Sequence, residues 1–307
     1  MEDGARSGNG GRVAIILIAA ALLGGGAWGW RTYDTNRFFR PPALFSRFPA
    51  EDATALSVDF AALRKAGLLA ESKAPLEPEY KAFLDGTGFD YRRDLDTLAA
   101  SFSKSGNYFI ARGRFDWNRL RGYALRQGGS CYQDLCRMQG SRPDRHISFL
   151  PLRGDAIALA VGSDDLAASR LTKEGLPVSA RVPDAPVWLS VPGAVLRSQD
   201  GVPAGIRMML SALKNADRVM LTVSPGGGGI EAHLETNCRT PDDARALTSE
   251  LRSTTSLLED TDPNDQAIRD DDLVKMLAAG VFEQAGQRVT GRWPVSKSLI
   301  ASLTSGI

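Results

Sequence analysis

Cys131 and Cys136 are the residues whose type and spacing come nearest to chemistry in this sequence. They stand in GGSCYQDLCRMQG (128–140), among glycines that favour turns. Their C-x4-C spacing is not the C-x-x-C spacing of redox-active or zinc-knuckle pairs. Facing positions across a four-residue hairpin loop fall within the Cα separation of about 4.4–6.8 Å that a disulfide tolerates. We therefore predict a structural disulfide, with free thiols and a metal or redox pair as the alternatives.

Other catalytic or metal-binding patterns find little support. The two histidines, His146 and His233, stand in separate strand-like runs, whereas a zinc site needs three or four converging ligands. No G-x-S-x-G elbow occurs, although triad residues converge only in space. The third cysteine, Cys238, is expected as a small buried strand residue. We expect no catalytic residue, no metal ligand, no cofactor-binding residue and no cofactor.

Three short motifs have simpler explanations than catalysis. Two S-x-x-K matches, 101–104 and 211–214, lack the S-D-N and K-T-G that complete the penicillin-recognising set. Glycines 226–229 lack the G-K-[ST] of a phosphate loop and stand between two strand-like runs. We interpret them as a hairpin turn.

Two acidic stretches also invite a functional interpretation. In EDTDPNDQAIRDDD (259–272), Asp260, Asp262 and Asn264 have the alternate spacing of a calcium loop, but the sixth position is not glycine and the twelfth is not glutamate. A solvated loop between two helices is the preferred interpretation, and calcium is the alternative. GFDYRRDLD (88–96) places Asp90, Asp94 and Asp96 beside two arginines, 92 and 93, which charge pairs around a helix start or turn would explain.

The overall composition is that of a folded globular protein. The 307 residues are 43% hydrophobic and 24% charged, so the chain can bury a core of its own. The formal net charge is only +1, and acidic residues accompany the arginines throughout. A clustered basic surface for nucleic acid is therefore not expected.

An uncharged apolar run near the start of the chain predicts a membrane anchor. The 18 residues from Val13 to Trp30 would span roughly 27 Å as a helix, close to the thickness of the hydrocarbon layer. A cleaved signal peptide and a buried core helix are the alternatives. Positive charges flank the run almost equally, but the short leading tail favours export of the body. We expect a single-pass protein of the cytoplasmic membrane with its C-terminal body in the periplasm.

The body of the chain shows an internal repeat. LSVDFAALR (56–64) returns as LSVPGAVLR (189–197), 133 residues later, with six of nine positions identical. After each copy come two alternating apolar runs around a turn, a helical stretch, two more such runs and a final helix. The second helical stretch opens with Thr240-Pro241, an N-cap followed by proline at the first helical position.

These observations predict an α+β fold of two similar modules. Each module has the order β-α-β-β-α-β-β-α, with an antiparallel sheet and helices on one of its faces, and internal duplication is the expected origin. The alternative is one larger α+β domain whose halves are alike by coincidence. The predicted organisation is a cytoplasmic tail (1–12), a transmembrane anchor or signal segment (13–30), a juxtamembrane linker (31–53), a first module (54–173), a connector (174–185) and a second module (186–307).

The anchor and the lack of a catalytic motif together predict a function in the bacterial envelope. We expect a non-enzymatic binding or scaffolding module exposed outside the cytoplasmic membrane, attached through its N-terminal helix. An envelope protein or a lipid is the expected partner. The alternatives are a hydrolase-type enzyme with its site between the two modules and a protein that binds an apolar ligand such as a lipid.

Overall fold

The computed structural model describes the chain in several ranges: 41–49, 52–69, 78–140, 142–153, 155–173, 182–197, 211–214, 216–226, 229–259, 271–296 and 299. The predicted membrane segment 13–30 and residues 260–270 of the acidic stretch lie outside them. No helix in the described ranges is both long enough and apolar enough to cross a bilayer.

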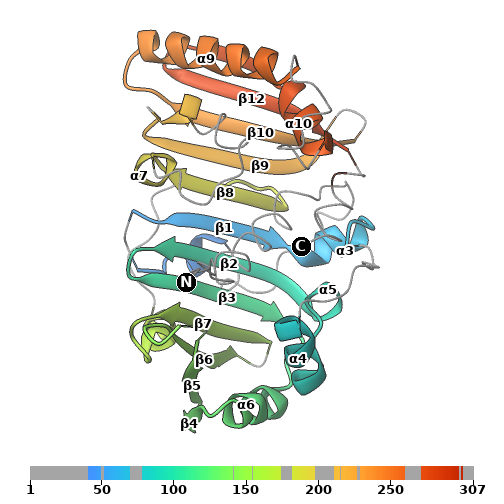
Figure 1. Cartoon of the computed structure of the whole chain (residues 1–307), viewed down its shortest axis with the longest axis vertical. Helices are drawn as coiled ribbons and strands as arrows, with labels where there is room; N and C mark the ends of the chain where they lie inside the picture. Colours follow the sequence, from blue (N-terminus) through green and yellow to red (C-terminus); the bar gives the residue numbers. More distant parts are fainter. Residues whose placement is uncertain are drawn as a thin grey trace, which may run out of the picture.

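Strands of the described residues form one antiparallel sheet, in the order β11-β12-β10-β9-β8-β1-β2-β3-β7-β6-β5-β4 (Figure 1). The twelve strands are β1 (Thr54–Asp59), β2 (Leu95–Ser103), β3 (Gly106–Gly113), β4 (Ser130–Tyr132), β5 (Leu135–Gln139), β6 (His146–Arg153), β7 (Ala156–Gly162), β8 (Val187–Pro192), β9 (Arg218–Gly226), β10 (Gly229–Asn237), β11 (Val281–Ala285) and β12 (Arg288–Val295).

Helices connect and cover these strands. They are α2 (Pro41–Phe45), α3 (Phe60–Lys65), α4 (Pro78–Thr87), α5 (Tyr91–Asp94), α6 (Trp117–Arg126), the 3-10 helix η2 (Ala167–Thr172), α7 (Gly193–Leu196), α9 (Pro241–Glu259) and α10 (Asp271–Ala278). The predicted N-cap of α9 is confirmed, because the amide of Asp243 donates to Thr240 Oγ1 at 3.1 Å. In the other half, Asp116 caps α6 in the same way by accepting from the amide of Arg119.

The fold class is α+β, as predicted, and strand alternation explains how the sheet is covered. In β10, Ile230, Ala232 and Leu234 are buried. Glu231 and His233, between them, are only partly buried. We call the side that carries these apolar residues, together with Leu56 of β1, the first face. Helices α3, α9 and α10 pack their apolar residues against it.

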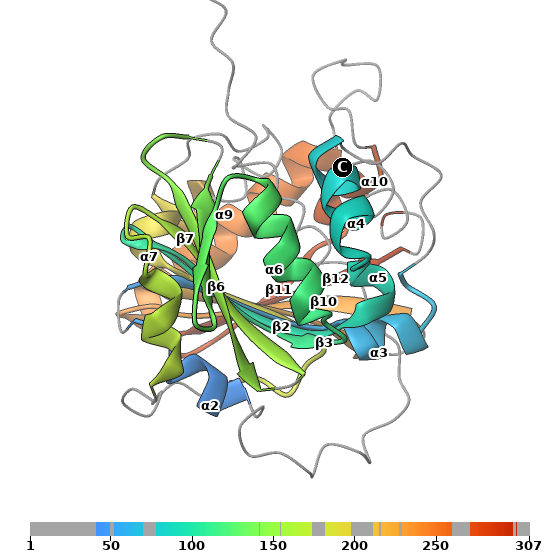
Figure 2. The ribbon, with the colours of Figure 1, turned by 90° about the horizontal axis from the view of Figure 1, so that it is seen from below.

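The second face is covered as well in the first half of the chain. Phe45 of α2 and Leu171 of η2 share a buried cluster with Tyr108 and Ile110 of β3, whose side chains point away from the first face. Figure 2 shows α2 on the opposite side of the strands from α6. The prediction of helices on one face only is therefore wrong for this half, because β3 and β7 carry apolar side chains on both faces.

The sheet runs without interruption through both predicted modules, where the sequence predicted a sheet in each. Strand β1 pairs with β8 in antiparallel register, and Leu56 faces Leu189 at the centre of this pairing. Outward from there the order is β1-β2-β3-β7-β6 on one side and β8-β9-β10-β12-β11 on the other. In both lists the first three strands of the chain lie in order and the fifth comes before the fourth. The hairpin β4–β5 is an addition to the first half.

Candidate binding site at the disulfide hairpin

Cys131 and Cys136 form a disulfide across the hairpin β4–β5. Their sulfur atoms are 2.02 Å apart and their Cα atoms 4.0 Å apart. The loop is shorter than the four residues expected, because Tyr132 pairs with Leu135 and only Gln133 and Asp134 make the turn. Gln133 has a φ of 51°, a left-handed conformation that glycine or asparagine adopts more readily.

The disulfide anchors the hairpin to the first face of the sheet. Cys136 is fully buried in a small cluster with Phe149 of β6 and with Leu120 and Ala124 of α6. Helix α6 therefore packs on the hairpin as well as on β6. The disulfide joins Cys131 of β4, the last strand of the sheet, to Cys136, which packs against α6.

A depression of about 470 Å³ lies on the other side of this hairpin, on the second face. Its walls come from the hairpin, from β6 and from the η2 segment, through Tyr132, Gln133, Asp134, Leu135, Arg137, Leu150, Leu166, Ser169 and Thr172. An ion pair of 2.7 Å between Arg137 and Asp165 joins the hairpin to the η2 segment.

Large apolar side chains reach solvent at this depression. Tyr132 is 77% exposed and Leu166 is 45% exposed, and both line it. A lining that combines these side chains with polar ones suits a ligand or a partner side chain with an apolar body and a polar end. Sequence reasoning singled out the cysteines but not Tyr132 or Leu166. The available signal was an aromatic residue at the tip of a predicted hairpin.

The histidines do not come together. His146 lies in β6 and His233 in β10, and six strands of the sheet lie between these two. His233 Nε2 is 3.2 Å from Glu231 Oε2 on the partly exposed second face. Among the residues that the structure describes, no group of three or more His, Cys, Asp or Glu side chains is placed to hold a metal ion.

The acids of residues 88–96 form charge pairs at the start of β2, as predicted. Asp96 contacts Arg64 at 2.7 Å, and Asp94 contacts Arg93 at 2.7 Å and Arg114 at 3.2 Å. Hydrogen bonding from Arg93 holds the pKa of Asp94 below its usual value, and the amide of Asp90 and the charge of Arg114 act in the same direction. This cluster is a structural one, since its buried carboxylate is already satisfied.

The remaining motifs take structural positions. Ser101 is buried in β2, while Lys104 lies exposed in the turn that follows. Gly226 pairs with Gly229 across the β9–β10 hairpin, as predicted. Cys238 is a buried free cysteine just after β10, and burial raises the pKa of its thiol. The alternative of calcium at 259–272 concerns a stretch that lies mostly outside the described residues.

The junction between the two halves is a strand pairing. On its first face, Leu56, Val58 and Val187 belong to one buried core. On its second face, Arg218 of β9 donates to Ser190 Oγ at 3.0 Å and contacts Asp52 at 3.1 Å. One alternative from the sequence was an enzyme site between the two modules. At that junction the main chains of β1 and β8 are hydrogen-bonded to each other.

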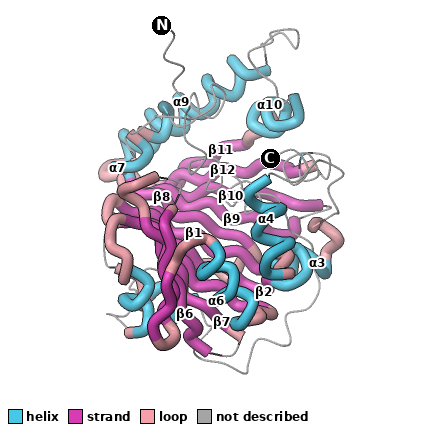
Figure 3. The backbone as a smooth tube through the Cα atoms, turned by 60° about the horizontal axis from the view of Figure 1, so that its bottom comes forward, coloured by secondary structure: helices cyan, strands magenta, loops and turns pink. Residues whose placement is uncertain are grey.

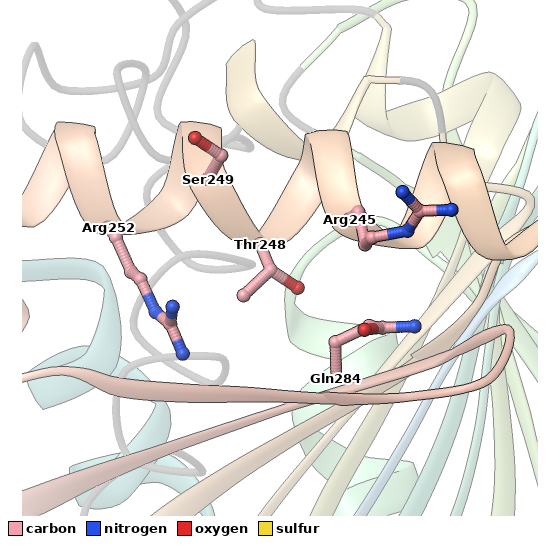
Figure 4. A pocket seen from close by; sticks show the side chains of 5 residues that line it. All are labelled: Arg245, Thr248, Ser249, Arg252 and Gln284. Carbon is pink, nitrogen blue, oxygen red and sulfur yellow. The ribbon is translucent and has the colours of Figure 1, made fainter.

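A second cavity, of about 270 Å³, lies at the other end of the sheet, between α9 and β11 (Figure 4). Arg245, Thr248, Ser249 and Arg252 line it from the helix, and Gln284 lines it from the strand. The sequence analysis singled out none of these residues.

No family model and no curated protein matches the chain. Among solved structures, crystal form III of TP0453 superposes with a TM-score of 0.47 and 12% identity, over 86% of this chain and 98% of that chain. Crystal form I of TP0453 gives a TM-score of 0.44 and 11% identity, over 85% of this chain and 95% of that chain.

Proposed function

We propose that this chain is a membrane-anchored protein of the bacterial envelope whose body binds or organises a partner outside the cytoplasmic membrane, without catalysing a reaction. The observation that carries the proposal is the disulfide between Cys131 and Cys136, next to a depression with exposed apolar walls. Disulfides persist in oxidising compartments, which agrees with export of the body. The apolar run 13–30 of the sequence supplies the anchor.

The body in this proposal is a duplicated α+β module. The same strand order on both sides of the β1–β8 pair supports the duplication. The register of β1 and β8 also supports the duplication. Ala55 pairs with Ser190, and Ser57 pairs with Trp188. Trp188 lies 133 residues after Ala55, and Ser190 lies 133 residues after Ser57, so the repeat relates each pair to the other. Such reciprocity is the mark of a two-fold interface.

The location can be tested in cells that express the full-length chain. Intact cells are treated with a membrane-impermeant protease and, separately, with a thiol reagent before and after reduction. Export predicts that the body is cut once the outer layers are made permeable, and that Cys131 and Cys136 react only after reduction. A body that is protected until the cytoplasmic membrane is broken, with both thiols reactive at once, would contradict the proposal.

The binding role can be tested at the depression. Replacing Tyr132 and Leu166 by serine removes its two exposed apolar walls, and replacing Leu257, which is 58% exposed on α9, is the matched control. We expect the first variant to lose its cross-links to the envelope partner in intact cells at an unchanged melting temperature. Equal cross-linking of both variants would rule out this surface.

A bound apolar ligand is the second candidate, because Leu135, Leu150 and Leu166 line the same depression. Its volume lies within the range of about 300–1,000 Å³ typical of small-molecule sites. Organic extraction of the purified chain, followed by mass spectrometry, should then release a lipid from the native protein but not from the Tyr132→Ser, Leu166→Ser variant. A substrate screen would overturn both candidates if the native protein turned over a substrate and a folded variant with one polar residue changed did not. The protein would then be an enzyme.

A further inference from the structure

Strand β11 in the second half corresponds to β6 in the first half. Each is the outermost strand of the five-strand order common to both halves. Phe149 of β6 pairs with Leu159, the fourth residue of β7, and Phe282 of β11 pairs with Gly291, the fourth residue of β12. Both phenylalanines are buried, so the correspondence extends to single positions.

The two strands differ in what lies on their outer side. Beside β6 lies β5, which pairs with it antiparallel so that Cys136 faces Phe149. The side chain of Cys136 fills the space between β6 and α6, against Leu120 and Ala124. Beside β11 the described residues contain no further strand, and this strand ends the sheet. The space that β5 occupies in the first half corresponds to the cavity between α9 and β11.

The backbone of β11 presents groups toward this space that bond to no strand among the described residues. The amide of Cys238 donates to the carbonyl of Gln287 in the β10–β12 register, so Arg288, Thr290 and Arg292 face β11 with their backbone groups. Their partners there are Ala285, Glu283 and Val281. Phe282 and Gln284 therefore direct their N–H and C=O groups away from the sheet, as Phe149 does toward β5.

Arg252 takes the place of a strand at one of these groups. Its Nη2 donates to the carbonyl of Phe282 at 2.7 Å, where an added strand would donate an amide. In Figure 4 its guanidinium points from α9 toward β11. A charged side chain that covers an open edge can prevent unwanted pairing, and it can also be exchanged for a ligand.

The chemistry of the cavity differs from that of its counterpart. Where the first half has Leu120, Ala124 and Cys136, the second half has Arg245, Thr248, Arg252 and Gln284. Arg245 pairs with Asp242 on its own helix, whereas Arg252 donates to a backbone carbonyl and has no carboxylate partner among the residues that the structure describes. Among the described residues that line the cavity, none is acidic. An entering strand would meet positive charge rather than apolar surface.

We propose that an extended acidic segment of a partner protein binds here by adding antiparallel to β11 as a further strand. Its amide replaces Arg252 at the carbonyl of Phe282, and its carbonyl accepts from the amide of Gln284. At alternate positions of the bound segment, Asp or Glu side chains point toward α9. Their carboxylates form ion pairs with Arg252 and Arg245. Main-chain bonds supply affinity and the carboxylates supply specificity, as in other cases of strand addition. This site is separate from the disulfide hairpin and does not depend on it.

The test uses the full-length chain in detergent and three fluorescent seven-residue peptides. The first has glutamate at alternate positions between threonines and valines, the second has lysine in place of glutamate, and the third is the first with N-methylated alternate amides. We expect saturable binding of the first peptide, weakened by salt, and binding at least about tenfold weaker for the other two. Hydrogen exchange of the Gln284 amide should slow when the first peptide binds.

Variants of the protein separate the contribution of the Arg252 charge from that of the β11 backbone. Arg252→Gln should weaken the glutamate peptide about tenfold or more, while Arg170→Gln, which changes an exposed arginine paired with Asp164 in the first half, should not. Gln284→Pro removes the outward amide to which the peptide carbonyl binds, without removing a bond to β12, and should weaken the glutamate peptide to about the affinity of the N-methylated peptide. Melting temperatures show whether each variant is folded, and the N-methylated peptide provides the same test of the edge without changing the protein.

Three results would overturn the proposal. The first is equal binding of the glutamate and lysine peptides. The second is full affinity of the N-methylated peptide, which would indicate attraction by charge alone. The third is binding that Arg252→Gln leaves unchanged, or protection that appears on strands other than β11.

Discussion

Asp94 is a clear case of one residue that holds a junction of elements together. Its carboxylate accepts from the amide of Asp90 at 3.0 Å and from two arginines, Arg93 beside it and Arg114 after β3. The side chain is only 10% exposed, whereas both arginines are mostly exposed. The carboxylate therefore fixes the corner where α5 leads into β2, and the arginines allow it to be buried while charged.

Replacing Asp94 by asparagine should destabilise the protein at neutral pH by about 1–2 kcal/mol, because charge-assisted hydrogen bonds are lost at a buried position. The pKa of Asp94 is lowered in the folded state, so its contribution is present above the unfolded pKa and is lost as pH falls through the folded pKa. The difference in melting temperature between the two proteins should thus shrink below about pH 4.

The matched control for this experiment is Asp155→Asn, which breaks a pair with Arg112 in which both side chains are over one-third exposed. It should cost less than about 1 kcal/mol. A cost for Asp94→Asn no larger than for this control, or one that does not vary with pH, would contradict the role assigned to Asp94.

The cysteines give a second prediction at the scale of residues. Replacing both Cys131 and Cys136 by serine should lower stability by about 2 kcal/mol, since the closed loop is very short. Thiol counting on the denatured, unreduced chain should find Cys238 alone, because the structure has one free cysteine and one disulfide. Three thiols before reduction would contradict the disulfide, and reduction should abolish the difference between the two proteins.

Among the elements, β11 allows a test of strand direction that needs no ligand. Glu283→Pro removes an amide that bonds to β12 and should cost about 2–4 kcal/mol, whereas Gln284→Pro removes an outward amide and should cost about 1 kcal/mol or less. Urea denaturation compares them on equal terms, because the two positions are neighbours in one edge strand. The reverse order of stability would mean that the alternation assigned to β11 is wrong.

At the scale of elements, local signals in the sequence were good predictors. The cap at Thr240 and the glycine hairpin at 226–229 depend on neighbouring residues only, and both are found. The turn at Gln133 could not be predicted in length, because glutamine has no preference for a left-handed φ and the register comes from pairing with β6. The cavity between α9 and β11 was not predicted, because the approach of Gln284 to this helix depends on residues far apart in the sequence.

For the whole molecule, the shared core predicts a single unfolding transition. Leu56 and Leu63 of the first half and Val187, Val223 and Leu251 of the second half belong to one buried cluster. Neither half can unfold without exposing the β1–β8 pairing and this cluster. Calorimetry of the full chain should therefore give one two-state peak. Two separable transitions, or a folded monomeric product from residues 54–173 alone, would contradict this.

Long-range features of the molecule were the ones that sequence reasoning missed. The pairing of β1 with β8 leaves no local pattern, since an alternating strand can pair with any suitable edge. Apolar residues on both faces of β7, in AIALAV (156–161), did signal that a second layer lies there, and α2 and η2 provide it. Figure 3 shows most helices on the other side of the strands, which is the arrangement that a single amphipathic pattern predicts.

The facing pair Leu56 and Leu189 restricts how this protein can change over generations. Each occupies the equivalent position in its own half, and the two face each other across the β1–β8 pairing, so their side chains are neighbours on the first face. A larger residue at one position calls for a smaller one at the other, so substitutions there should be strongly non-additive. In descendants of this sequence, the summed volume of the two side chains should vary less than the volume of either one. The two positions should therefore covary, although they lie far apart in the gene.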